Sequence, residues 1–146
     1  MKHSNKIKTI KDAMLLNSPT IGTMQREKGR VFTEAMVMGW LVYLNELLNL
    51  NKPMSEDQIE MCATEILNDF YALKFSDLTL LFKKIISGSY GEFYESLSIP
   101  KVLSFFRDYF DERCDVAVQE SEMNHKNFTS DETFNYSNNV KRYLKK

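Results

Sequence analysis

The residue types that most often carry catalysis or bind metals are scattered in this sequence. Its two histidines, His3 and His125, both lie in polar terminal segments. No H-E-x-x-H motif, pair of E-x-x-H motifs, glycine-rich phosphate loop, G-x-S-x-G or C-x-x-C motif is present. Cys62 and Cys114 are far apart, which predicts neither a disulfide scaffold nor a zinc cluster. We therefore expect a protein that is not an enzyme, with no catalytic residue, metal site or cofactor.

One group of carboxylates falls on a single face of a predicted helix: Asp108, Asp111, Glu112 and Asp115. Such a face could hold a divalent cation through its oxygen atoms. Arg107 and Arg113 are interleaved with the carboxylates, however. A solvated, partly salt-bridged surface is the interpretation that we favour.

The most individual stretch is a glycine-marked aromatic loop, and its candidate binding residues are Tyr90, Gly91, Phe93 and Tyr94, with Lys83, Lys84 and Lys101 nearby. Stacked aromatic rings with neighbouring lysines could bind the bases and phosphates of single-stranded nucleic acid. Alternatively, the loop is a turn between helices whose rings close the end of a bundle. We favour the second interpretation. Glu92 and Glu95, which would repel phosphates, weaken the first interpretation further.

Composition predicts an all-α fold: a single compact bundle of four to five helices with a polar C-terminal arm. A chain of 146 residues can form one domain with a substantial core. Only five glycines and three prolines are present, too few for the frequent turns of a sandwich or barrel. We expect the helix from Thr33 to Asn51, apolar nearly all round, to lie buried at the centre of the bundle. A recognition helix in a partner's groove is the alternative.

Capping signals predict where three further helices begin. Ser55 and Gln58 form a capping box, with Met54 placed to pack on Ile59. Ser76 is a second expected N-cap. Pro100 is expected at the first position of a final helix that ends between Gln119 and Asn124.

The termini differ in character from the middle of the chain. Residues 1–17 read as a basic leader with a short helix, residues 18–120 as the helical domain, and residues 121–146 as a polar arm or tail. In the short helix, Ile7, Ile10, Met14 and Leu15 are expected on one side. Residues 1–30 carry a net charge of +5 and residues 140–146 carry +4, so the middle carries about −10. No signal peptide is apparent and no stretch approaches a membrane span, so we expect a cytoplasmic protein that does not bind membranes.

Four short blocks carry a family resemblance: M-S-E-D-Q-I from Met54, I-L-N-D-F-Y-A-L-K-F-S-D-L from Ile66, G-S-Y-G-E-F-Y from Gly88, and F-x-x-Y-F-D-E-R from Phe106. Over residues 18–118 the chain resembles small helical proteins of Bacteroides-type genomes, phages and mobile elements. More loosely, its order of helices is similar to that of phage replication accessory proteins that load or regulate a replicative helicase.

The resemblance implies a replication or mobile-element context and transfers no functional residue. Our leading hypothesis is an accessory protein that binds a protein partner in replication, with single-stranded DNA as a second ligand. The alternative is a structural or assembly protein, a virion component or homo-oligomeric adaptor, that uses residues 121–146 to dock on a neighbouring subunit.

Overall fold

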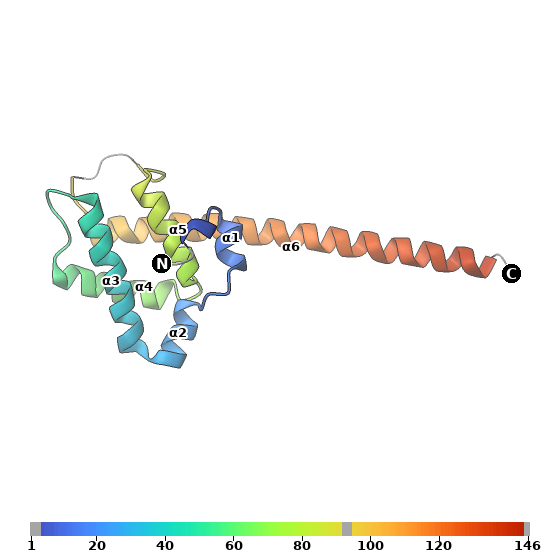
Figure 1. The fold of residues 1–146 in the computed structure, drawn as a ribbon, viewed down its shortest axis with the longest axis horizontal. Helices are drawn as coiled ribbons and strands as arrows, with labels where there is room; N and C mark the ends of the chain where they lie inside the picture. Colours follow the sequence, from blue (N-terminus) through green and yellow to red (C-terminus); the bar gives the residue numbers. More distant parts are fainter. Residues whose placement is uncertain (1–3, 92–94, 145–146) are drawn as a thin grey trace. The chain divides into compact units, whose positions relative to one another are not determined.

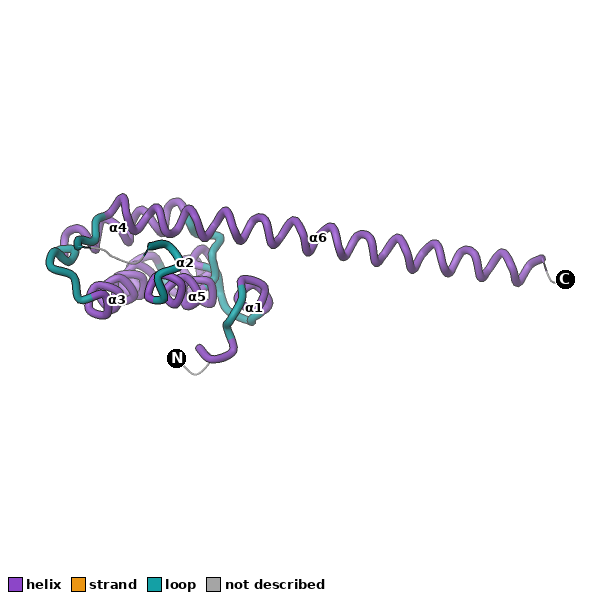
Figure 2. Tube along the Cα trace, turned by 90° about the horizontal axis from the view of Figure 1, so that it is seen from above, coloured by secondary structure: helices purple, strands orange, loops and turns teal. Residues whose placement is uncertain are grey.

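The predicted all-α class is confirmed. The computed structural model describes the backbone of residues 4–91 and 95–144, and the side chains of residues 5–91 and 95–127. Over these residues the chain forms helices joined by loops and no strand (Figures 1 and 2). The elements are the 3-10 helix η1 (Ser4–Lys6) and the helices α1 (Ile10–Leu15), α2 (Ile21–Lys28), α3 (Arg30–Leu48), α4 (Glu56–Asp69), α5 (Phe75–Ile86) and α6 (Ile99–Leu144). Their number exceeds the expected four to five because α2 forms a helix of its own.

The chain divides into two compact units, residues 1–111 and residues 112–146, and α6 contributes to both. The prediction that the last helix ends between Gln119 and Asn124 is wrong, because α6 continues to Leu144. No glycine or proline follows Pro100, so nothing in the backbone interrupts the helix. The polar arm is therefore helical over most of its length.

In the first unit, α3 packs against α2, α4 and α5, and α1 packs against α5 (Figure 1). The core that these helices share with the start of α6 includes the fully buried side chains Ile21, Leu41, Leu44, Ile66, Leu81, Phe105, Phe106 and Tyr109. Trp40 joins three helices: its indole N–H donates to the carbonyl of Leu78 at 3.1 Å, and its ring meets Phe82 and Phe106 edge-on. Such edge-to-face contacts stabilise a core beyond the area that they bury.

The start of α4 confirms the predicted capping box. The Ser55 hydroxyl accepts from the amide of Gln58, and the Gln58 side chain accepts from the amide of Ser55 at 3.0 Å. Upstream, Asn45 of α3 binds both backbone groups of Met54, at 2.9 and 3.0 Å. One amide side chain thus holds the loop before α4 on the end of α3.

The start of α5 differs from the prediction. Lys74, not Ser76, is the N-cap, and Asp77 accepts from the Lys74 amide through Oδ2 at 2.8 Å. Asp77 is fully buried, and its Oδ1 accepts from the hydroxyl of Tyr109 in α6 at 2.7 Å. Ser76 lies inside the first turn, where its hydroxyl donates to the carbonyl of Ala13 at 2.7 Å.

The same turn of α5 holds the N-terminal segment. The Lys74 ammonium donates to the carbonyls of Met14 and Leu16, at 2.7 and 3.1 Å. These contacts satisfy carbonyl groups at the end of the short helix α1, which otherwise lack intrahelical partners. Ile7 and Ala13 are buried as a result, whereas Leu15, expected on the same side, is 75% exposed.

Helix α3 is buried on one side only. Thr33, Val37, Leu41 and Leu44 line the buried side, and the opposite side is exposed. The expectation of a helix surrounded by the bundle is therefore wrong within the described part of the chain. By length and composition alone α3 could also cross a membrane, contrary to the expectation that no stretch approaches a span. The core helix of a soluble protein passes the same test.

We predict that replacing Tyr109 by Phe destabilises the first unit by about 2 kcal/mol, because a buried carboxyl oxygen loses a hydrogen-bond donor while packing is retained. Chemical denaturation measures the change. Tyr43→Phe, at a half-exposed ring that keeps its stacking on Phe82, is the control and should leave the free energy of unfolding within about 0.5 kcal/mol of the parent. Equal stability of the two variants would contradict the assignment.

Candidate functional site

Those residues predicted to form a binding loop that the structure describes lie where α5 ends and α6 begins, and several of them contact one another. The ring of Tyr90 is half-buried and lies 5.8 Å from that of Phe105, centroid to centroid. The Lys84 ammonium lies 5.5 Å from the centre of the Tyr90 ring and 5.8 Å from that of Tyr109. These are cation–π distances, at which a ring face attracts an ammonium group.

The other two predicted lysines also have intramolecular contacts. The Lys101 ammonium lies 5.4 Å from the centre of the Phe105 ring. Lys83 instead donates to the carbonyl of Ile7 at 3.0 Å, which fixes the N-terminal segment. The structure thus brings Lys101 and Tyr90 to the buried Phe105 and Lys84 to Tyr90, and gives Lys83 a different role.

Glycines shape the loop itself. Gly88 and Gly91 have φ angles of 82° and 128°, which side-chain-bearing residues rarely adopt. The Gly91 amide donates to the carbonyl of Gly88 at 3.1 Å and closes a tight turn around Tyr90. The predicted site residues Phe93 and Tyr94 lie outside the described residues. Beyond them, the backbone of Leu97 donates to the carbonyl of Lys52 at 3.2 Å, joining this loop to the one before α4.

This geometry accords with the turn that we favoured from the sequence. The lysines and the tyrosine bind groups of their own chain, and Tyr90 presents one ring face to Lys84. A base or phosphate would have to compete with these contacts.

A second candidate site is the exposed side of α3, the helix for which the sequence left a recognition helix in a partner's groove as the alternative. We define the outer face of α3 as nine residues, all of them exposed: Val31, Phe32, Ala35, Met36, Gly39, Val42, Tyr43, Glu46 and Leu47. Glu46 carries the only charge on this face. A helix that folds on the surface of a bundle normally has polar residues on its solvent side. The lack of a polar stripe between Val31 and Glu46 was the signal in the sequence.

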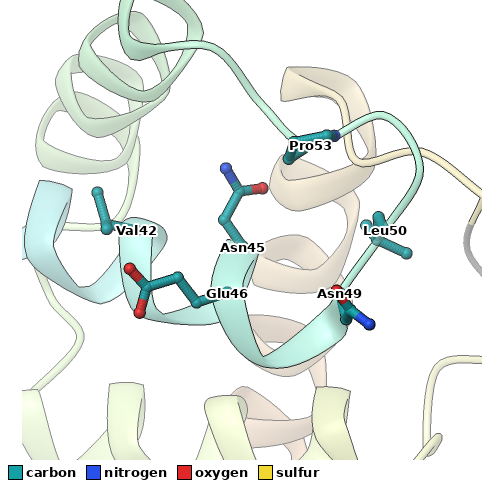
Figure 3. A pocket seen from close by; sticks show the side chains of 6 residues that line it. All are labelled: Val42, Asn45, Glu46, Asn49, Leu50 and Pro53. Atoms are coloured by element: carbon teal, nitrogen blue, oxygen red, sulfur yellow. The ribbon is translucent and has the colours of Figure 1, made fainter.

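A shallow pocket borders the outer face at the C-terminal end of α3. It is lined by Val42, Asn45, Glu46, Asn49, Leu50 and Pro53 (Figure 3). The α3 helix forms one wall, and the loop that turns back toward α4 forms the other. Asn49 ends the helix in the left-handed conformation, with φ at 46°, which directs the chain into that loop.

Few groups in the described part of the chain are arranged for covalent chemistry or metal binding. Cys62 is fully buried, and burial together with the charge of Glu65 raises the pKa of its thiol to about 12, so it stays protonated near neutral pH. Cys114 is an exposed free thiol. Among the described residues, no three His, Cys, Asp or Glu side chains gather as metal ligands would. The carboxylates from Asp108 to Asp115 form no such group.

Comparison with family models, curated proteins and solved structures finds no match to this chain. The geometry of its surfaces is therefore the basis for a functional proposal.

We predict that Tyr90→Ala destabilises the protein by about 1–2 kcal/mol, because the ring is partly buried and contacts both Lys84 and Phe105. A ring that served only as an exposed platform would give no change. Thermal unfolding measures the difference, and Ser89→Ala, at an exposed neighbouring position, is the matched control.

Proposed function

We propose that this protein is a non-enzymatic accessory protein of a phage or mobile element, which acts in DNA replication by binding a partner protein, as a helicase loader does. The outer face of α3 is the observation that carries the binding role. The resemblance of four sequence blocks to proteins of phages and mobile elements supports the context.

The size of the outer face supports binding rather than simple exposure. Six of its side chains are large and apolar: Val31, Phe32, Met36, Val42, Tyr43 and Leu47. Val31 is 85% exposed and Phe32 is 49% exposed. Together they form an apolar surface on the order of a few hundred Å², which in soluble proteins often marks an interaction site.

Single-stranded DNA is the second ligand in this proposal, at Lys84, Lys101 and Tyr90. Each of these side chains keeps part of its surface exposed. A strand would use the lysines for phosphate contacts and the tyrosine for stacking, at the expense of their internal cation–π contacts. We therefore expect weak binding that depends on salt.

Two measurements test the proposal: co-purification with the replicative helicase of the same phage or element, and titration of a labelled single-stranded oligonucleotide at several salt concentrations. We expect a stable helicase complex. For DNA, replacing Lys84 and Lys101 by Gln should lower the slope of log K against log salt by about 0.7 for each phosphate group that is no longer neutralised.

Lys52→Gln, at an exposed position in the loop before α4, is the control for the DNA titration and should keep the slope. Failure to bind the helicase together with failure to bind DNA would refute the replication role.

A second candidate function is structural: a virion component or homo-oligomeric adaptor that docks through its C-terminal arm. The continuous helix α6 favours it. In the second unit, Val118 and Met123 are exposed apolar residues on this helix. A neighbouring subunit could pack against them.

Truncation after Gln119 tests the structural candidate. We expect it to break the assembly into smaller species in sedimentation velocity, while helicase binding through α3 persists. Unchanged mass and unchanged thermal stability would reject docking through the arm.

A further inference from the structure

We propose that the outer face of α3 is covered by a second copy of this chain, with the two α3 helices antiparallel and crossing at Gly39. The inference rests on the proposed role in protein binding, and the second copy would compete with the helicase for this one face. It makes the accessory protein a symmetric dimer.

Gly39 marks the crossing point. A helical wheel at about 100° per residue places it at the centre of the outer face. Glycine weakens a helix relative to alanine, yet a Cβ atom added at Gly39 would meet nothing within 4 Å. The described part of the chain thus has no steric need for glycine here. A second helix that crosses at this point would supply the need, because small residues let two helix backbones approach closely.

The register of an antiparallel pair brings apolar residues onto the pocket. With a two-fold axis at Gly39, each residue faces one equally far beyond Gly39 in the second copy. Val31 lies eight residues before Gly39, about 12 Å along the axis at 1.5 Å per residue. The pocket residues Asn45 and Asn49 lie six and ten residues after it, about 9 and 15 Å away. Val31 of one copy therefore lies at the height of the pocket of the other.

The two sides of the face also match. On the wheel, Val31, Val42 and Asn49 lie on one flank, and Met36 and Tyr43 lie on the other. A two-fold axis perpendicular to both helices keeps each flank opposite the same flank of the second copy. Val31 thus meets the pocket beside Val42 (Figure 3), and Met36 meets Tyr43.

The charges of the face suit the same arrangement. The two copies of Glu46 would lie fourteen residues apart along the axis, about 21 Å, so they would not repel strongly. Each would instead lie at the height of Phe32 in the first turn of the other α3. That turn has no side-chain cap, since its N-cap is Gly29. A carboxylate near a helix N-terminus is stabilised by the dipole of the helix.

The area of the outer face sets the expected affinity of the two copies for each other. A few hundred Å² of apolar surface on each copy is less than the roughly 800 Å² per partner of a standard interface. Leu50 and Pro53 at the pocket wall would add to it. We therefore expect a reversible dimer whose population rises with concentration.

Sedimentation equilibrium tests the dimer. We expect the dimer fraction of the parent protein to rise with its concentration. Met36→Glu should weaken association at least tenfold, because each copy would bury a carboxylate in the apolar interface. Met61→Glu is the matched control: Met61 is an exposed methionine on α4, outside the outer face, and this variant should dimerise like the parent. Parent protein that stays monomeric at all concentrations would overturn the inference.

Disulfide trapping tests the register, in a Cys114→Ser background that leaves only the buried Cys62. The double variant Met36→Cys/Tyr43→Cys should cross-link, because Met36 of one copy lies at the height of Tyr43 of the other and on the same flank. Phe32→Cys is on the same face but about 21 Å from its own copy along the axis, too far for a disulfide. Equal cross-linking of both variants would overturn the antiparallel register.

A different occupant of the outer face would give a different set of results in these experiments. If the protein is monomeric and Met36→Glu abolishes helicase binding or binding to phosphatidylglycerol vesicles, the second copy is ruled out as the occupant. In the helicase case the proposed function stands. If the protein neither self-associates nor binds the helicase or DNA, the inference and the proposed function fail together.

Discussion

The hydrogen bond between Asp77 and Tyr109 is the interaction on which the first unit depends. Both side chains are fully buried, and the bond joins the first turn of α5 to α6. A buried carboxyl group is stable only when its oxygens have partners, and the second oxygen of Asp77 accepts from the amide of Lys74. One side chain therefore both begins α5 and positions α6. The turn that it organises also holds the N-terminal segment through Lys74 and Ser76.

Three lysines close to the core make contacts within the chain through their ammonium groups. Lys74 and Lys83 donate to backbone carbonyls of the N-terminal segment, and Lys84 lies over the rings of Tyr90 and Tyr109. In each case the ammonium group meets an acceptor or a ring face. Residues that resemble a phosphate-binding cluster in the sequence thus stabilise the fold, and any ligand at this end must displace their contacts.

Helix α3 connects the fold to the proposed function. Its buried side packs on α2, α4 and α5, and its outer face carries one charge among nine exposed residues. The two sides are almost equally apolar, which explains why composition alone places this helix in the middle of a bundle or across a membrane. Exposing this apolar face to water costs free energy, and a partner that covered the face would remove that cost.

Local sequence was sufficient to predict the all-α class, the capping box at Ser55 and the turn at Gly88, because these follow from residue spacing and backbone preference. Local sequence was insufficient for the N-cap of α5, predicted at Ser76, because other contacts outweighed the local signal. It was also insufficient for the end of α6, predicted near Gln119, because no local signal for a helix end is present there. Which side of α3 is exposed depends on the packing of the other helices, since both sides have similar hydrophobicity. The meeting of Lys84, Tyr90 and Phe105 likewise depends on the packed fold, because that contact joins residues of different elements.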